Sequence, residues 1–346
     1  MSSYPPIVIT HAGAFHADEL MAIALLERFA FTSPLRVALC WEPQDVQALI
    51  EHDRRPPVPA LVDERGVQDC RQPVWVFRTR QPELLEAARA RPDVFVIDVG
   101  GHYDPTALNF DHHQAEMTLT WPNGTTYSST GLVWRWLEDT GRLSSLPDQV
   151  RSSLAERLIE PLDAHDNGVR LSPDGTAVEE YNRSGGGDPE VQLIQFEKAL
   201  RLCRDRLENA LHATTNRELA RDVLAHAWSR ASARGERFVI LDEPLPGTDG
   251  TRLLHEVSGG HCLLLGLPSQ SNRYSLISLP ANEDRFSIIC PVPESWRGRM
   301  DFSVDLGQLG SVHLAFAHKT GFMCVVEGGP KETRAVATYL TQSAAA

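Results

Sequence analysis

The sequence lacks any closely spaced pair of cysteines. Its six cysteines are scattered over 346 residues, and none forms the C-x-x-C pair that is typical of zinc knuckles and thiol redox sites. We therefore expect reduced thiols rather than disulfides, as in a cytosolic protein. The cysteines are Cys40, Cys70, Cys203, Cys262, Cys290 and Cys324.

Long apolar runs are also missing. No stretch approaches the roughly 18 consecutive apolar residues that a membrane-spanning helix requires. The N-terminal sequence, Met-Ser-Ser-Tyr-Pro-Pro, has neither the basic region nor the apolar run of a secretory signal. The sequence therefore predicts a cytoplasmic location and no membrane partner.

Positive charge is scarce, since 33 Lys and Arg residues face 46 Asp and Glu residues and the net charge is −13. This balance argues against a broad, sequence-independent nucleic-acid coat, which needs a positive surface. A nuclease remains open, because bound divalent ions and a local arginine patch can hold phosphate. The apolar content of 42% and charged content of 23% are ordinary for a soluble globular protein, and the length suits two domains.

Short apolar runs alternate with helical patterns in the first half of the chain. This alternation predicts an α/β domain with a mostly parallel sheet flanked by helices. In such sheets, sites form at the carboxyl ends of the strands. The predicted strands are 7–10, 36–41, 60–62, 74–77 and 94–99, and the predicted helices are 17–28, 82–90, 132–138 and 149–162.

The second half of the chain changes character. Two long helical patterns, 191–212 and 216–234, suggest a helical linker over 189–234. Beyond residue 235, short apolar runs and a final helix at 331–340 predict a smaller α+β domain. The strands predicted there are 238–241, 262–265, 274–279, 286–290, 312–317 and 323–326.

Histidines and aspartates gather at the ends of predicted elements. Such groups are costly to bury unless a cation or a hydrogen bond compensates them. We therefore predict that distant clusters assemble into one metal centre. The clusters are His11-Ala-Gly-Ala-Phe-His16-Ala-Asp18, Asp98-Val-Gly-Gly, Asp111-His112-His113 and Asp163-Ala-His165-Asp166.

The mixture of imidazole and carboxylate suits two divalent ions. We expect Mn²⁺ first, because of the large share of oxygen donors, with Mg²⁺, Co²⁺ or Zn²⁺ as alternatives. Two such ions can share a carboxylate and a water, lower the pKa of that water toward ~7, and clamp the attacking and leaving oxygens of a phosphoester. Asp98 is the expected bridge. Asp163 ends a predicted helix, where an anion is disfavoured unless a cation lies opposite.

Ordinary roles compete with metal binding for some of these residues. Single histidines such as His52 and His226 are more often surface or core residues than ligands. His165 is more easily explained by a structural role, and Asp166 is open between supporting the ligands and capping a loop. The residues that we predict as a ligand set are His11, His16, Asp18, Asp98, His112 and Asp163.

The motifs together resemble a known family. H-x-x-x-x-H-x-D, D-V-G-G-x-Y-D-P, F-D-H-H-Q and D-A-x-D-N-G are similar to those of the MYG (melanocyte proliferating gene) branch of the DHH phosphoesterase superfamily. His16 stands where the superfamily usually has aspartate, which is typical of this branch. The segments 293–298 and 318–322 also resemble it, so the likeness spans nearly the whole chain.

The resemblance implies a role for each ligand. His11, His16 and Asp98 would hold one metal, and the second would be held by Asp18, Asp98, His112 and Asp163. His113 would face the scissile phosphate, steadying it or protonating the leaving group, and with Asp98 and Asp111 it makes up the predicted catalytic set. Residues 1–188 would be a DHH-type catalytic domain and 235–346 a DHHA-like substrate-binding domain, with the active site in the cleft between them.

Three C-terminal residues are candidates for binding a substrate phosphate or terminal nucleotide: Arg297, His318 and Lys319. Arg297 could equally stack on its tryptophan neighbour, and Lys319 is well explained as a solvated turn residue. Arg78 and Arg80 could guide a nucleic-acid backbone, or simply lie at an exposed strand end.

The chain departs from the family pattern in two places. Residues 35–73 look like an insertion, for which a lid or a homodimer contact is conceivable. In addition, residues 323–327 separate Gly321-Phe322 from the pair Gly328-Gly329, which follows the last motif more closely in the family.

The function predicted first is a two-metal phosphodiesterase that acts on RNA or short oligonucleotides, because family members with assigned activity resemble 3′-to-5′ exoribonucleases. The alternative is a phosphohydrolase for pyrophosphate, a cyclic dinucleotide or a nucleotide, which the acidic balance suits somewhat better. A non-catalytic, metal-stabilised binding protein is a third possibility, disfavoured by the complete ligand set.

Overall fold

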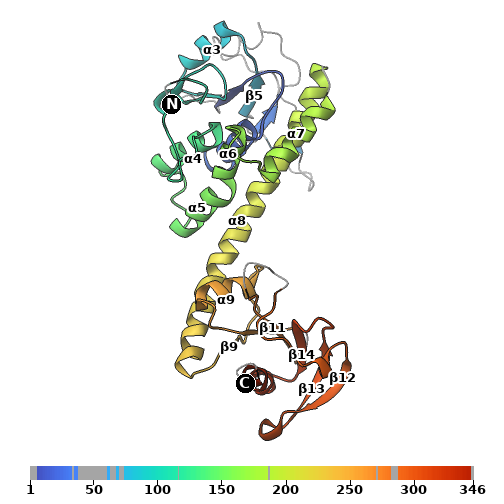
Figure 1. Cartoon of the computed structure of the whole chain (residues 1–346). Helices are drawn as coiled ribbons and strands as arrows, with labels where there is room; N and C mark the ends of the chain where they lie inside the picture. Colours follow the sequence, from blue (N-terminus) through green and yellow to red (C-terminus); the bar gives the residue numbers. More distant parts are fainter. Residues whose placement is uncertain are drawn as a thin grey trace. The chain divides into compact units, whose positions relative to one another are not determined.

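The computed structural model describes residues 6–32, 35–37, 61–62, 68–69, 74–115, 117–185, 188–269, 272–281 and 287–343. The chain divides into two compact units, Met1–Leu211 and His212–Ala346 (Figure 1). The domain limits predicted at 188 and 234, and a site in a cleft between domains, stay predictions. Most of the predicted insertion at 35–73 lies outside the described residues.

The first unit is built on a six-stranded sheet in the order β2-β5-β1-β6-β8-β7. Every neighbouring pair is parallel except β7 with β8, which confirms the predicted α/β class with a mostly parallel sheet. The strands are β1 (Ile7–Thr10), β2 (Leu35–Val37), β5 (Val74–Arg78), β6 (Val94–Ile97), β7 (Tyr103–Asp104) and β8 (Asn109–Phe110), and a separate hairpin pairs β3 (Leu61–Val62) with β4 (Gln68–Asp69).

Helices cover both faces of this sheet. Successive side chains of a strand point to opposite faces, so Val8 of β1 joins one core while Ile7 and Ile9 join another. The first core includes α1 (Ala17–Phe29) and α4 (Ser129–Asp139), which pack on each other. The second is closed by α3 (Pro82–Arg89). Burial on both faces explains why β1 and β6 are apolar without alternation.

A helical stretch with a π turn follows. α5 (Asp148–Leu154) passes through the π turn Ala155–Ile159 into α6 (Glu160–Asp166), so the helix predicted over 149–162 is longer than expected. Pro161 lies in the first turn of α6. It has no amide to bond to the preceding turn, which favours an irregular helix at this point. α6 carries Asp163 and Asp166.

One long helix replaces the two that were predicted near the middle of the chain. After α7 (Pro173–Gly185), α8 runs without interruption over Pro189–Ala233 and contributes residues to both units. None of the described helices combines the length and apolar character needed to cross a membrane.

The second unit has a mixed six-stranded sheet in the order β12-β13-β14-β11-β10-β9, in which only β9 and β10 are parallel. Its core gathers apolar residues of the sheet and of the last helix. The elements are β9 (Phe238–Ile240), α9 (Gly250–Ser258), β10 (Leu264–Pro268), β11 (Arg273–Ser278), β12 (Met300–Asp305), β13 (Ser311–Ala317), β14 (Met323–Glu327) and α10 (Pro330–Ser343).

Some expectations for this unit were wrong. Of the strand predicted over 286–290, residues 287–290 are described and hold only an isolated bridge from Ile288 to Pro280. β12 and α9 were not predicted. β12 alternates exposed and buried residues, which places Phe302 and Val304 in the core, and this period of two was the available signal.

Candidate metal centre

The carboxyl ends of β1, β6 and β8 bring three distant parts of the chain to one edge of the sheet. His11 follows β1, Asp98 follows β6, and Asp111 follows β8. β6 pairs in parallel with both β1 and β8, so these ends are adjacent, as predicted. Asp98 has φ 56°, in the left-handed region that aspartate tolerates better than most residues.

His11 is buried against two carboxylates. Its Nε2 lies 3.1 Å from Glu19 Oε1 and 3.2 Å from Asp98 Oδ2. On the other side of the ring, Arg80 donates from Nε to the carbonyl of Ala12 at 2.8 Å and places a guanidinium nitrogen 2.9 Å from His11 Nδ1. The ring is therefore held with Nε2 toward the carboxylates.

Asp98 connects the upstream and downstream clusters. Its Oδ2 faces His11, while its Oδ1 lies 3.4 Å from His112 Nε2 and 3.6 Å from His113 Nδ1. Ser129, at the start of α4, directs its hydroxyl toward Asp98 Oδ1 at 3.3 Å. A carboxylate with one oxygen toward each cluster has the arrangement that a bridging ligand needs.

His112 faces the remaining acidic groups. Its Nε2 lies 3.1 Å from Asp166 Oδ2 and 3.9 Å from Asp18 Oδ2. Asp18 belongs to the first turn of α1, and Asp166 is the last residue of α6. Two helices and a strand end thus supply the second group of donors.

Among the described residues, three sets of donor atoms could each hold a metal ion. Within each set, the atoms lie within 4.8 Å of one another. His16 and Asp98 each belong to two sets, so the sets overlap. Five of the six predicted ligands occur in them. The sets are His11, His16 and Asp98; Asp98, His112 and His113; and His16, Asp18 and Asp166.

Two buried donor atoms of the centre lack an aligned hydrogen bond among the described residues: Asp18 Oδ1 accepts none, and His112 Nε2 has only its ion-pair contacts with Asp166 and Asp98. Leaving such atoms unsatisfied is costly. A divalent cation would satisfy both, and the combination of imidazole and carboxylate fits Mn²⁺, Co²⁺ or Zn²⁺. The residues present therefore fit the predicted cofactor.

Asp163, the sixth predicted ligand, has other partners. It is fully buried, and it accepts hydrogen bonds from Trp121 Nε1 at 2.6 Å, Ser128 Oγ at 2.5 Å and the Gly131 amide at 3.0 Å. It belongs to none of the metal-binding sets found in the described residues. Asp166 belongs to one of these sets, and the role of Asp163 as a ligand stays a prediction.

His113 is exposed and is oriented by Asp111. The buried Asp111 carboxylate lies 2.7 Å from His113 Nδ1 and also accepts the His113 amide at 3.1 Å. This hydrogen bond raises the pKa of His113 despite partial burial. Because Nδ1 is occupied, Nε2 is the nitrogen available to a ligand.

The acidic groups of the centre require positive charge. Burial raises the pKa of Asp18 well above its usual range, and the neighbouring Asp98 and Asp166 raise it further. Burial would lower the pKa of His112, but Asp166 and Asp98 outweigh it and raise that pKa to about 11. His11 follows the same pattern, since Glu19 and Asp98 outweigh burial and raise its pKa to about 10. Protons or divalent cations can supply this charge.

Sequence reasoning missed the roles of Glu19 and Arg80. Glu19 was read only as an acid suited to the start of a helix, yet it is fully buried, contacts His11, and accepts hydrogen bonds from the Thr10 hydroxyl and, at 3.1 Å, from the His16 amide. Its complete burial could not be read from a helix start. Arg78 and Arg80 bind the loop after β1, Arg78 by donating to the Gly13 carbonyl at 2.8 Å.

The three predicted substrate residues lie in the second unit. Arg297 donates to the Val292 carbonyl at 3.0 Å and packs over Gly321, where a Cβ would collide with it. His318 packs against the Phe322 ring at 4.6 Å, and Lys319 is exposed. Arg297 thus contacts the turn that carries His318 and Lys319, but a shared role in binding substrate stays a prediction.

Two solved structures of RecJ show low similarity. The chain is 13% identical to RecJ from Thermus thermophilus in complex with Mn²⁺, with a TM-score of 0.26, covering 97% of this chain and 52% of that one. It is 16% identical to an exonuclease RecJ bound to manganese, with a TM-score of 0.23, covering 98% and 90% of the two chains. The chain spans about half the length of the Thermus protein.

Sequence relatives are closer. The chain is 25% identical to the MYG1 exonuclease of Rattus norvegicus over 352 residues, 92% of this chain and 80% of the relative. It is 25% identical to the MYG1 exonuclease of Homo sapiens over 354 residues, 92% and 81% of the two chains. The MYG1 protein of Chlamydia trachomatis is 27% identical over 331 residues, 93% and 92% of the two.

The family model described as an uncharacterised protein family, UPF0160, of MYG1 exonuclease type, matches residues 65–342, well over half of the chain. This confirms the resemblance seen in the motifs. The chain therefore belongs to the MYG1 exonuclease family.

Proposed function

We propose that this chain is a metal-dependent phosphodiesterase that shortens RNA or short oligonucleotides from the 3′ end and releases nucleoside monophosphates. The observation that carries the proposal is the placement of His11, His16, Asp18, Asp98 and His112 in overlapping sets of donor atoms, with two buried donor atoms that lack an aligned hydrogen bond among the described residues. Membership of the family, and relatives named as exonucleases, support a nucleic-acid substrate.

His11, His16 and Asp98 would hold one cation, and Asp18, Asp98, His112 and Asp166 the other. When bound, the cations supply Lewis-acid charge that activates water and stabilises the phosphoryl oxygens. Mn²⁺ is the ion that we propose, on the share of oxygen donors.

His113 is the residue of this chain best suited to act on the substrate. Asp111 holds its Nδ1 and stabilises the protonated form of the ring, which raises the pKa of His113. A protonated Nε2 can donate to a phosphate oxygen or to the leaving oxygen. Asp111 orients the ring and stabilises its charged form.

A small-molecule phosphohydrolase is the second candidate, because the net charge of −13 would disfavour long polyanions. It predicts phosphate release from pyrophosphate or a nucleotide with no dependence on chain length. An exonuclease predicts a ladder of shortened products and mononucleotides.

The test is incubation of the full chain with a 5′-labelled single-stranded RNA of about 12 nucleotides in Mn²⁺, with pyrophosphate and a dinucleotide as parallel substrates. We expect stepwise shortening from the 3′ end. No product from RNA or from the dinucleotide would remove the proposal, and phosphate release from pyrophosphate alone would favour the second candidate.

Asp98→Asn is the matching inactive variant, since asparagine also tolerates the left-handed conformation at this position. We expect RNA hydrolysis to fall to background. Asp205→Asn, an exposed position on α8, removes the same charge far from the ligands in sequence and should retain full activity.

A further inference from the structure

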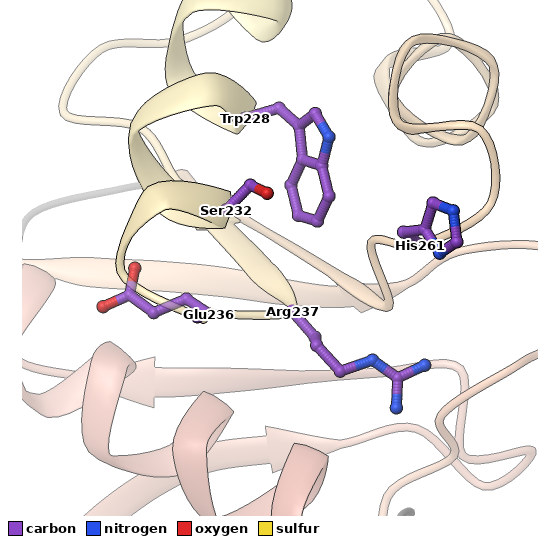
Figure 2. Close-up of a pocket in the computed structure, with 6 residues that line it drawn as sticks. Trp228, Ser232, Glu236, Arg237 and His261 are labelled. Atoms are coloured by element: carbon purple, nitrogen blue, oxygen red, sulfur yellow. The ribbon is translucent and has the colours of Figure 1, made fainter.

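The second unit contains a cavity of about 350 Å³ to which the metal centre contributes no residue. Its volume is at the lower end of the range for small-molecule sites. All lining residues come from 228–261, within one unit (Figure 2). They are Trp228, Ser232, Gly235, Glu236, Arg237 and His261.

A tryptophan and a hydroxyl form the helical wall of this cavity. Trp228 and Ser232 are four residues apart on α8 and therefore share a face of the helix. The indole is half-buried and packs on the apolar cluster around Leu224 and Leu253. It is thus held in place while part of its surface lines the cavity.

His261 and Arg237 complete the walls. α9 ends at Ser258, and two glycines with positive φ, Gly259 at 59° and Gly260 at 77°, turn the chain so that His261 follows directly. Figure 2 shows the imidazole of His261 across from the indole, with the Arg237 side chain extending below both. The cavity therefore combines an aromatic ring with two groups that can bind an anion.

The two charged groups that line the cavity, Glu236 and Arg237, have different partners. Glu236 is paired with Arg234 at 2.8 Å and with Arg334, and Figure 2 shows its carboxylate directed away from the other lining groups. Arg237 is exposed, and no ion pair links it to the part of the chain that the structure describes. The carboxylate of the cavity is therefore already neutralised by Arg234 and Arg334, whereas Arg237 remains available to an anion.

We infer that this cavity binds a nucleotide unit, with the base stacked on Trp228 and the phosphate held by Arg237 and His261. Stacking on an aromatic ring accepts any base, since every base has a π face. A guanidinium matches the geometry of a phosphate, and Ser232 adds a donor and acceptor for the sugar or base edge. The inference rests on the proposed function, and it adds a nucleotide subsite formed by residues other than Arg297, His318 and Lys319.

Binding is measured on the full chain with two probes: an oligoadenylate of about 12 nucleotides with phosphorothioate linkages that resist hydrolysis, and AMP. We expect Trp228→Leu to weaken oligonucleotide binding about tenfold or more, and Trp228→Phe to retain most of it. Arg237→Gln should lower the slope of log affinity against log salt by about 0.7, the value for one phosphate on a single strand. Arg252→Gln, an exposed arginine on α9, is the control and should change neither.

The AMP probe separates two sources of the same ligand. If Trp228→Leu weakens the binding of AMP and of the oligonucleotide equally, the cavity binds a free or terminal nucleotide. If it weakens the binding of the oligonucleotide alone, the cavity binds a nucleotide within a strand. Wild-type affinity of Trp228→Leu and Arg237→Gln for both probes would overturn the inference. If Trp228→Leu does not fold, Arg237→Gln decides, because an unchanged salt slope in this variant contradicts phosphate binding.

Failure of the two proposals can be told apart. A wild-type chain that cuts no RNA in Mn²⁺ but binds oligonucleotide through Trp228 would sink the proposed exonuclease and leave the cavity assigned. If the wild-type chain hydrolyses RNA, and neither Trp228→Leu nor Arg237→Gln changes oligonucleotide binding, the exonuclease proposal stands and the assignment of the cavity fails.

Discussion

Asp163 and Asp166 lie one turn apart on α6, yet they have different partners. The three hydrogen bonds to Asp163 come from a tryptophan, a hydroxyl and a backbone amide, while Asp166 lies 3.1 Å from His112. Asp163 therefore fixes the loop before α4 to α6, and Asp166 is the better candidate for a ligand.

Asp166→Asn is expected to weaken divalent-metal binding about 10- to 100-fold with little change in thermal stability. Asp163→Asn is expected to lower thermal stability and to leave divalent-metal binding nearly unchanged. Its amide nitrogen cannot accept hydrogen bonds, so donors are left unpaired at a cost of about 1–3 kcal/mol. Calorimetric titration with Mn²⁺ and thermal unfolding of both variants measure this, and loss of metal from Asp163→Asn at an unchanged Tm would contradict it.

Glu160 should make stability depend on pH. Burial would raise its pKa, but hydrogen bonds from Asn123 at 2.9 Å and Thr125 at 2.8 Å, with the charge of Arg170, outweigh burial and lower it. A carboxyl with a lowered pKa stabilises the fold above its unfolded pKa of about 4.3, and this is lost as the pH falls through the folded value.

The stability difference between wild type and Glu160→Gln should therefore be largest near pH 7 and shrink toward pH 3. Thermal unfolding across this range measures it. Glu156→Gln, at an exposed position of the same helical stretch, should show no such trend. A difference that grows on acidification would argue against the assignment.

At the scale of an element, α4 depends on a glycine for close packing. A Cβ at Gly131 would overlap the carboxylate of Asp163 and the ring of Tyr127. We expect Gly131→Ala to lower the Tm, although alanine favours a helix by about 1 kcal/mol over glycine. Asp139→Ala, exposed on the same helix, should stabilise slightly or not at all, and a Gly131→Ala protein more stable than wild type would refute the tight contact.

The elements that sequence predicted well are those whose signal is local. β1, α1, β6 and most of the ligands could be found because apolar runs and strand-end histidines are readable within a few residues. The sequence left Asp166 open between supporting the ligands and capping a loop, because a helical pattern does not reveal a π turn such as Ala155–Ile159, on which the orientation of α6 depends. The burial of Glu19 depends on packing against β1 and likewise has no local signal.

At the scale of the whole molecule, the proposed metal centre should couple the stability of the first unit to divalent cations. Asp18, Asp98 and Asp166 repel one another once cations are removed, so chelation should destabilise the first unit and leave the second unaffected. A ligand at 100 times its Kd contributes about 2.7 kcal/mol. Chelator should accelerate hydrogen exchange in β1 and β6 and leave exchange in β10 and β11 unchanged. Equal acceleration in both units would contradict this expectation.

The sequence predicted the fold and the site of the first unit better than those of the second. In the first unit, a parallel sheet brings strand ends together by topology, so a list of strand-end residues already predicts a site. In the second unit, the cavity at Trp228 joins a helix, a strand end and the turn after α9. α9 was not predicted, so nothing in the sequence indicated that His261 would lie near Trp228.

Mn²⁺ stoichiometry of the wild-type chain and of Asp98→Asn tests the metal centre most directly. Asp98 belongs to two of the donor sets and faces both His11 and His112. Equilibrium binding should give two ions per wild-type chain and loss of tight binding at both positions in the variant. A variant that still binds two ions with wild-type affinity would show that these side chains do not form the centre.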